Sequence, residues 1–172
     1  GTSAYEKRGI ATRLPVWDAT ACIQCNRCSF VCPHAVIRPY LLDEAEVAAA
    51  PADFTTVPAK GAAGLAFSLQ ISDMDCTGCG SCVASCPMTG KALRMERVER
   101  ELTVTPAWEY GLTISEKDAF NADTVKGSQF RQPLCEFSGA CAGCGETPYA
   151  KLLTQLYGDR MYWANATGCS QA

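Results

Sequence analysis

Residues 22–33 read CIQCNRCSFVCP, and residues 76–87 read CTGCGSCVASCP. Each stretch has the spacing C-x2-C-x2-C-x3-C-P, and each cysteine of the second stretch lies 54 residues after its counterpart in the first. Three thiolates with two residues between each pair, on a tight loop, can surround one corner of an iron–sulfur cube, because such clusters are held by cysteine thiolates. The fourth cysteine points away and can reach another cube. The chain therefore contains an internal repeat that predicts two 4Fe–4S clusters.

This spacing is typical of bacterial two-cluster ferredoxins, in which the fourth cysteine of each run ligates the other cluster. We therefore expect crossed ligand sets. Cluster 1 takes Cys22, Cys25, Cys28 and Cys86, and cluster 2 takes Cys76, Cys79, Cys82 and Cys32. Pro33 and Pro87 are expected to turn the chain out of the short helix after each loop, since proline cannot continue a helix.

Two other uses of these cysteines fit less well. Disulfides require an oxidising compartment, and cysteines two residues apart give poor bridge geometry. Structural zinc sites use CxxC pairs, but not two copies of this longer run with a trailing Cys-Pro.

The two loops differ at two equivalent positions. The second loop has Gly78 and Gly80, which keep bulk away from its cluster and leave backbone N–H groups free to point at sulfur. The first loop has Gln24 and Asn26 there. Because hydrogen bonds to sulfur tune a cluster, we expect different reduction potentials at the two sites.

Composition narrows the class of protein. The 172 residues include 12 cysteines, 48% are hydrophobic and the formal net charge is −3. This excludes a disordered chain, and without a basic surplus we expect neither nucleic acid nor membrane as a partner. With no leader and no long apolar run, we expect a cytoplasmic protein. The chain begins with Gly1 rather than methionine, and residues 168–172 show neither a cap nor a polar tail. We therefore expect a piece of a longer polypeptide or a processed subunit.

Around the loops the sequence predicts an α+β fold in which strand, ligand loop, short helix and strand occur twice. Strands are expected at 15–17, 37–41, 65–73 and 93–98. Residues 65–73 alternate apolar and polar side chains, which is typical of a half-buried strand. We assign this two-cluster ferredoxin-like domain to residues 14–100, after a linker at 1–13.

One further segment lies between the two repeats and another follows the second repeat. Residues 43–64 form an insertion whose first part, DEAEVAAA, predicts a helix with acidic residues at its favourable N-terminal end. We expect the insertion to serve packing or docking. Residues 101–126 lose periodicity and predict an extended arm across a larger body.

A third cysteine group follows in residues 139–149, GACAGCGETPY, where small residues around Cys141 and Cys144 permit close backbone approach to a cofactor. We expect a helix with Thr147 as N-cap and Gly158 as terminator, and with positions 149, 152, 153, 156 and 157 on one apolar face. Residues 161–164, MYWA, predict a buried strand, and Cys169 follows its end. Since α/β sheets bind ligands at the carboxyl ends of strands, these three cysteines are candidates for one site.

Several stretches resemble the pyruvate:ferredoxin (flavodoxin) oxidoreductases. They are YEKRG at 5–9, CIQCN at 22–26, GSQF at 127–130, residues 139–149 and NATGCS at 165–170. The resemblance spans nearly the whole chain. It implies that residues 10–100 are an inserted two-cluster ferredoxin domain and that residues 127–172 begin a thiamine-diphosphate-binding α/β domain.

The resemblance also implies roles for single residues. Cys141, Cys144 and Cys169 match three ligands of a third 4Fe–4S cluster, and Glu146 and Cys169 match positions that contact thiamine diphosphate. The family's fourth ligand, its thiamine diphosphate/Mg²⁺ motif and its pyruvate and coenzyme A sites lie outside residues 1–172. No catalytic residue is therefore expected in this chain. Cys135 matches no family ligand, and we interpret it as a buried, unreactive thiol rather than a fourth thiolate.

The function implied by the resemblance is electron transfer within an enzyme that converts pyruvate and coenzyme A to acetyl-CoA and CO₂. Electrons leave the thiamine adduct and pass through the 4Fe–4S clusters to a ferredoxin or flavodoxin. The whole enzyme is expected to be a homo-oligomer, and this chain alone is not expected to be catalytic. The alternatives are a stand-alone polyferredoxin and the iron–sulfur part of another 2-oxoacid:ferredoxin oxidoreductase. Residues 127–170 disfavour the polyferredoxin, because a simple carrier has no use for this further unit.

Among the remaining residues, the single histidine, His34, is expected at the surface or in packing rather than as a ligand. The three tryptophans are expected as core or interface anchors.

Overall fold

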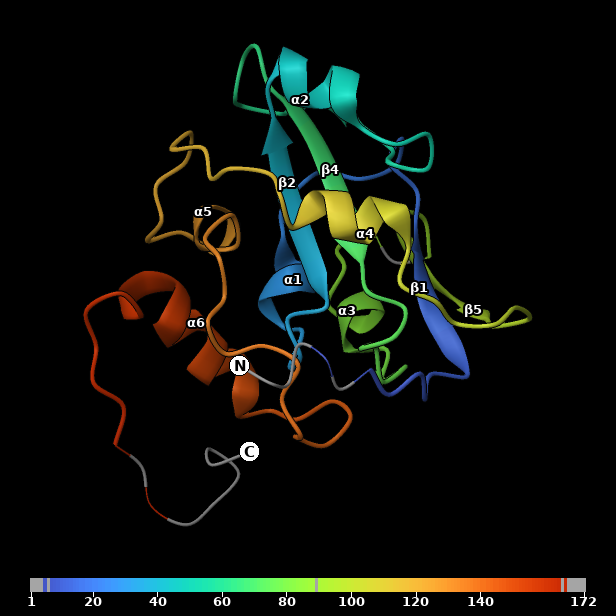
Figure 1. Cartoon of the computed structure of the whole chain (residues 1–172), viewed down its shortest axis with the longest axis vertical. Coiled ribbons are helices and arrows are strands. Elements are labelled where there is room, and N and C mark those ends of the chain that lie inside the picture. Colours follow the sequence, from blue (N-terminus) through green and yellow to red (C-terminus); the bar gives the residue numbers. More distant parts are fainter. Residues whose placement is uncertain (1–4, 6, 89, 165, 167–172) are drawn as a thin grey trace.

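The structure is a computed structural model that describes residue 5 and residues 7–88, 90–164 and 166 (Figure 1). Its elements, in chain order, are β1 (Arg13–Trp17), α1 (Arg27–Phe30), β2 (Ile37–Leu42), α2 (Glu44–Ala49), β3 (Val57–Pro58), β4 (Ala66–Ile71), α3 (Ser81–Ala84), β5 (Leu93–Arg97), α4 (Pro106–Gly111), α5 (Val125–Ser128) and α6 (Thr147–Tyr157). The two repeats are β1–α1–β2 and β4–α3–β5, which confirms the expected order of strand, loop, helix and strand. None of the helices in this part of the chain has the length and apolar character that a membrane span requires.

The two repeats interlock through two antiparallel sheets. β1 pairs with β5, so that Trp17 lies opposite Leu93. β2 pairs with β4, with Ile37 opposite Ile71, and β3 pairs with the other edge of β4. Each sheet thus joins a strand of one repeat to a strand of the other, and this exchange places the two cysteine loops side by side.

The main core lies between these sheets and the cysteine loops. Phe67 and Leu69 of β4 pack there with Ile37 and Leu93, and Trp17 meets Phe67 edge-on at a ring-centroid distance of 5.9 Å. Five cysteines of the repeat are buried in the same cluster: Cys28, Cys32, Cys76, Cys82 and Cys86. The cysteines are therefore part of the core.

The expectation of a half-buried strand at 65–73 is wrong for the polar face of β4, which is buried as well. Ser68 donates a hydrogen bond to the Thr55 carbonyl at 2.7 Å, and the Gln70 amide donates to the Ser68 hydroxyl at 2.7 Å. These hydrogen bonds give the Ser68 hydroxyl and the Gln70 amide nitrogen partners within the protein. A second apolar cluster, built around Leu42, Phe54 and Ala107, covers this side of the sheet.

The helix expected at the start of residues 43–64 is α2, and Asp43 and Glu46 form a capping box at its N-terminus. The extended arm expected at 101–126 is wrong for residues 106–111, which form α4 in front of β2 and β4 (Figure 1). Thr105 caps α4 by accepting a hydrogen bond from the Trp108 N–H at 3.1 Å. The Trp108 side chain is buried in the main core, so α4 anchors the arm.

Helix α6 ends at Gly158 as expected, but two details of the interpretation are wrong. Its N-cap is Glu146, and Thr147 is its first helical residue. Its apolar face points outward, since Tyr149 is 70% exposed, while the buried residues are Thr147, Ala150, Lys151 and Gln155. The polar face is therefore the one that packs on the rest of the molecule.

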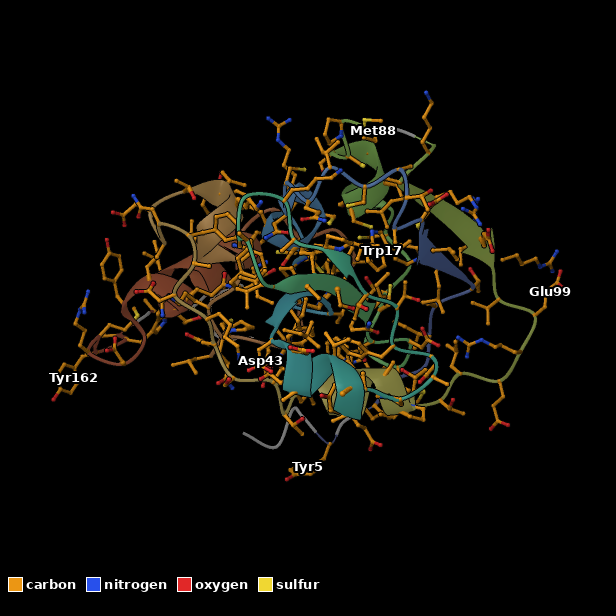
Figure 2. All side chains as sticks on the ribbon, turned by 90° about the horizontal axis from the view of Figure 1, so that it is seen from above. Tyr5, Trp17, Asp43, Met88, Glu99 and Tyr162 are labelled. Atoms are coloured by element: carbon orange, nitrogen blue, oxygen red, sulfur yellow. The ribbon has the colours of Figure 1, made fainter. Side chains whose placement is uncertain are left out.

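Residues 161–164 do not form the predicted buried strand. Tyr162 is fully exposed and points away from the body, as Figure 2 shows. Within the described ranges no strand pairs with these residues, so their backbone N–H and carbonyl groups have no neighbouring strand to bond with.

Candidate metal centres

The first cavity collects cysteines from both repeats. Its lining includes Cys22, Cys25 and Cys28 from the first loop and Cys86 from the end of the second. Its other walls are mainly apolar and include Trp17, Phe67, Leu69, Met88, Ala92 and Leu93. The structure thus brings together the four residues expected for cluster 1 among largely apolar walls.

The second cavity mirrors the first. Cys76, Cys79 and Cys82 line it together with Cys32 from the end of the first loop. Pro15, Ile37 and Met95 contribute apolar walls, and His34 lies at the same cavity. The exchange of the fourth cysteine follows from the fold, because each short helix directs the chain behind it toward the neighbouring loop.

Both loops owe their shape to backbone in the left-handed region. φ is 59° at Gln24 and 58° at Asn26, and it is 70° at Gly78 and 79° at Gly80. This shape lets backbone N–H groups turn inward. The Gln24 N–H donates to Cys22 Sγ at 3.3 Å, and the Gly78 N–H donates to Cys76 Sγ at 3.4 Å. The repeat therefore extends to hydrogen bonds on sulfur.

The two polar residues of the first loop tie it to distant segments. The Gln24 amide donates to the Pro58 carbonyl at 2.9 Å and accepts from the Lys60 N–H at 2.6 Å. The Asn26 amide donates to the Lys126 carbonyl at 2.9 Å. Both side chains are 2% exposed. Sequence reasoning singled out these positions but did not predict the anchoring, since the partners lie 34 to 100 residues away.

Burial favours the neutral form of the cavity thiols. Burial, reinforced by neighbouring cysteines, raises the pKa of Cys76 to about 11 and of Cys82 to about 12, and it raises the pKa of Cys28 further. Without a cation these groups stay protonated, whereas ligation requires the thiolate. In the described ranges no three His, Cys, Asp or Glu side chains could hold a single metal ion. Four thiols around each cavity instead fit a multinuclear iron–sulfur cluster.

The third cysteine group lies beside the second cavity. A Cβ atom on Gly143, where φ is +71°, would lie 3.5 Å from Cys79 Cβ and 3.6 Å from Ser81 Oγ. Cys141 is exposed and Cys144 is half-buried.

Hydrogen bonds from the Thr147 and Glu146 backbone, at the start of α6, lower the pKa of Cys144 and favour its thiolate. The Glu146 side chain is exposed. Cys169 lies outside the described residues.

Two other residues have clear environments. His34 is buried, so packing rather than a surface position is right, and its Nδ1 lies 3.5 Å from the Ser138 hydroxyl. Burial lowers its pKa and favours the neutral ring. Cys135 is half-buried rather than buried, and its partial burial raises the pKa of its thiol.

Comparison with known proteins agrees with this geometry. A family model described as a 4Fe-4S dicluster domain matches residues 21–90, which contain all eight cysteines of the two cavities. The chain is 57% identical over 171 residues to a pyruvate-flavodoxin oxidoreductase of Klebsiella pneumoniae, and 60% identical over 174 residues to a pyruvate:ferredoxin oxidoreductase of Moorella thermoacetica. The chain is similar along nearly its whole length to one segment of these oxidoreductases. The alignments cover 99% of this chain but 15% of each of these two relatives.

A related enzyme of another type is also similar. A pyruvate dehydrogenase [NADP(+)] of Cryptosporidium parvum is 55% identical over 177 residues, which cover 99% of this chain and 9% of the relative. The chain thus spans one segment of much longer oxidoreductases that act on pyruvate.

Proposed function

We propose that this chain is the electron-transfer segment of an enzyme that oxidises pyruvate to acetyl-CoA and CO₂ and reduces a ferredoxin or flavodoxin. The observation that carries the proposal is the pair of cavities, each lined by four thiols exchanged between the repeats. The similarity to pyruvate-flavodoxin and pyruvate:ferredoxin oxidoreductases supports the reaction and the acceptor.

Crossed ligand sets follow from the same geometry. Cys22, Cys25, Cys28 and Cys86 hold cluster 1, and Cys76, Cys79, Cys82 and Cys32 hold cluster 2. When bound, 4Fe–4S clusters accept and release single electrons. The chain's own residues position the cubes, keep water out with apolar walls and direct backbone N–H groups at the sulfurs. Iron analysis of residues 1–172 is expected to give about eight atoms, four for each cube.

The third cysteine group supports an order of electron flow. We assign Cys141, Cys144 and Cys169 to a third cluster, near thiamine diphosphate and Mg²⁺ in the whole enzyme, with Glu146 at the thiamine. The position of Gly143 next to Cys79 supports entry of electrons at cluster 2, which passes them to cluster 1.

The outward apolar face of α6 supports a further domain that begins near residue 127. Tyr149, Leu153 and Tyr157 are exposed on that face, and Trp163 is exposed just beyond it. Burying such side chains is favourable, so this face suits packing against the remaining domains. We place the whole enzyme in the cytoplasm as a homo-oligomer.

The test uses the full-length oxidoreductase that contains this segment. Pyruvate and coenzyme A added without oxygen are expected to produce the electron paramagnetic resonance (EPR) signals of reduced 4Fe–4S clusters, and added flavodoxin is then expected to be reduced. A Cys25→Ala/Cys79→Ala variant lacks one ligand in each cavity and is expected to lose flavodoxin reduction. Undiminished flavodoxin reduction without both clusters would contradict the proposal.

A further inference from the structure

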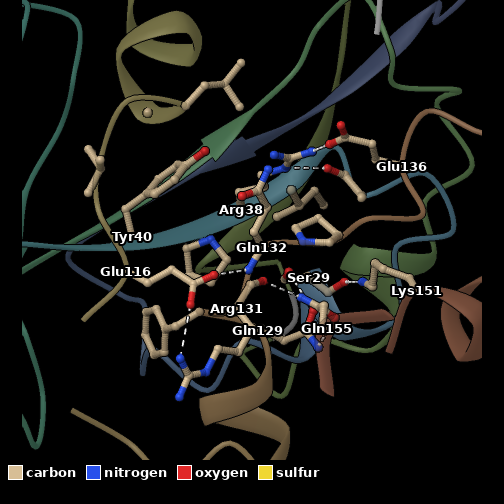
Figure 3. A pocket seen from close by; sticks show the side chains of 18 of the residues that line it. Ser29, Arg38, Tyr40, Glu116, Gln129, Arg131, Gln132, Glu136, Lys151 and Gln155 are labelled. Atoms are coloured by element: carbon tan, nitrogen blue, oxygen red, sulfur yellow. Dashed lines mark hydrogen bonds and ion pairs between the residues drawn. The ribbon is translucent and has the colours of Figure 1, made fainter. Parts of the chain in front are cut away.

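Lys151 is a buried cation in the layer that joins α6 to the two cavities. The residue is 1% exposed. Its Nζ donates hydrogen bonds to the Ser29 carbonyl and, at 3.3 Å, to the Phe30 carbonyl at the end of α1, as Figure 3 shows for Ser29. A lysine is almost never this buried unless a partner compensates its charge.

The two carbonyls lie at a particular place in the chain. Ser29 and Phe30 stand between Cys28, which lines the first cavity, and Cys32, which lines the second. An ammonium group held on this segment therefore lies next to the connection between both cavities. Burial lowers the pKa of Lys151 to about 8, and the charges of Cys32 and Cys28 oppose that shift. Both cysteines are thus close enough for Lys151 to act on them electrostatically.

No carboxylate compensates this charge within the part of the chain that the structure describes. Lys151 takes part in none of the ion pairs there, and the carboxylate of Glu136 is paired with Arg38. A buried charge without a counter-charge is strongly unfavourable. The remaining source of negative charge is the set of cysteine thiolates and the clusters that they bind.

A buried polar network fixes the position of the lysine. The Ser29 hydroxyl donates to the Gln129 amide oxygen at 3.0 Å, and the Gln129 amide donates to Gln155 at 3.1 Å. Gln155, one helical turn after Lys151, donates to the Arg131 carbonyl at 2.9 Å. These residues line the same pocket (Figure 3). The network thus anchors Ser29, whose carbonyl accepts a hydrogen bond from the ammonium of Lys151.

We propose that the fixed positive charge of Lys151 raises the reduction potentials of both clusters, an inference that rests on the function proposed above. Each cluster gains one electron and no proton on reduction, so its negative charge increases by one while Lys151 stays protonated. A nearby buried cation favours the more negative, reduced form, and net charge is among the factors that set cluster potentials. Lys151 thereby makes both clusters better electron acceptors.

The test is an EPR-monitored redox titration of the full-length oxidoreductase with its clusters. In Lys151→Met, the equilibrium constant for one-electron reduction of each cluster is expected to fall about tenfold, which corresponds to a potential lower by about 59 mV. The matched control is Gln155→Met, which changes the same buried helix face without changing charge. In Gln155→Met and Lys151→Arg, the equilibrium constant for one-electron reduction of each cluster is expected to stay within about threefold of the wild-type value.

Unchanged potentials in Lys151→Met would overturn the proposal, and so would equal shifts in Lys151→Met and Gln155→Met. If Lys151→Met does not retain its clusters, the redox titration is done on Lys151→Gln, which keeps a hydrogen-bond donor at this position but removes the positive charge. Loss of clusters in Lys151→Gln but not in Gln155→Met would show a structural role and overturn the proposal. Absence of two 4Fe–4S signals in the wild type would instead refute the proposed function.

Discussion

The loops at residues 22–28 and 76–82 adopt one backbone shape with different side chains. Both loops turn through positive φ at two equivalent positions and direct an N–H group at the first cysteine sulfur. In the second loop, Gly78 and Gly80 adopt this shape at no steric cost. In the first loop, Gln24 adopts this shape at a cost on the order of 1–3 kcal/mol, whereas asparagine tolerates the left-handed region and the cost at Asn26 is smaller.

The difference teaches what each loop gains. Three partly buried hydrogen bonds tie the first loop to residues 58, 60 and 126, and each contributes about 1 kcal/mol, which offsets much of the backbone strain. Gly78 and Gly80 have no side chain that could form such hydrogen bonds. Gly143 of the third cysteine group instead lies next to Cys79 of this loop. The first loop is thus fastened to the protein, and the second leaves a surface open to the third cysteine group.

The largest expected effect comes from giving the second loop a side chain of the first. In Gly78→Gln, a Cβ atom lies 3.0 Å from the Arg13 carbonyl oxygen, and φ is unfavourable for any side chain. The free energy of unfolding is expected to fall by about 2 kcal/mol, with loss of iron from cluster 2. Urea denaturation and iron analysis check this. The matched control Gly80→Asn meets no atom within 4 Å and is expected to cost under about 1 kcal/mol. Equal free energies of unfolding for the two variants would contradict the prediction that a side chain is more crowded at position 78 than at position 80.

The second prediction separates strain from anchoring in the first loop. Gln24→Ala leaves the Lys60 N–H and the Pro58 carbonyl without this partner and keeps the strained φ, so we expect a loss of about 2 kcal/mol. Gln24→Gly loses the same hydrogen bonds but relieves the strain, so its loss is expected to be about 1 kcal/mol smaller. Denaturation of both variants measures the difference. A glycine variant less stable than the alanine variant would show that Gln24 is not strained.

The smallest expected effect concerns Glu46 in the insertion at residues 43–64, which also contains Pro58 and Lys60, the hydrogen-bond partners of Gln24. Burial works to raise the pKa of Glu46, but hydrogen bonds from Lys117, at 2.8 Å, and from the Asp43 backbone outweigh it and lower the pKa. The ionised Glu46 therefore raises the free energy of unfolding at pH values above its ordinary pKa of about 4.3. This contribution is lost as the pH falls through the lower pKa that Glu46 has in the folded protein. The contribution is at most about 1 kcal/mol. Stability of wild type and Glu46→Gln at pH 7 and pH 3 checks it, and the two proteins should differ at pH 7 but not at pH 3.

Much of the fold was predictable because its signals are local. The repeated cysteine spacing identifies both loops, and the acidic start of residues 43–50 identifies α2. Helix α4 also has a local signal in its Thr105 cap and Pro106, but at six residues it is too short for a search by periodicity.

Other features were not predictable because they depend on distant partners. The apolar stripe of α6 resembles a core-facing surface, and only the tertiary contacts of Lys151 and Gln155 show that the polar side packs inward. A lysine opposite an apolar stripe ordinarily faces solvent. Residues 161–164 have strand-like composition, but a strand needs a neighbour to pair with.

The central claim is that each repeat supplies one ligand to the cluster of the other. The most direct measurement compares the EPR spectra of reduced Cys86→Ala, Cys25→Ala and Cys79→Ala variants of the full-length oxidoreductase. The account predicts that Cys86→Ala alters the same cluster signal as Cys25→Ala, because both residues line the first cavity. If Cys86→Ala instead altered the signal that Cys79→Ala alters, each repeat would hold its own cluster and the account would be contradicted.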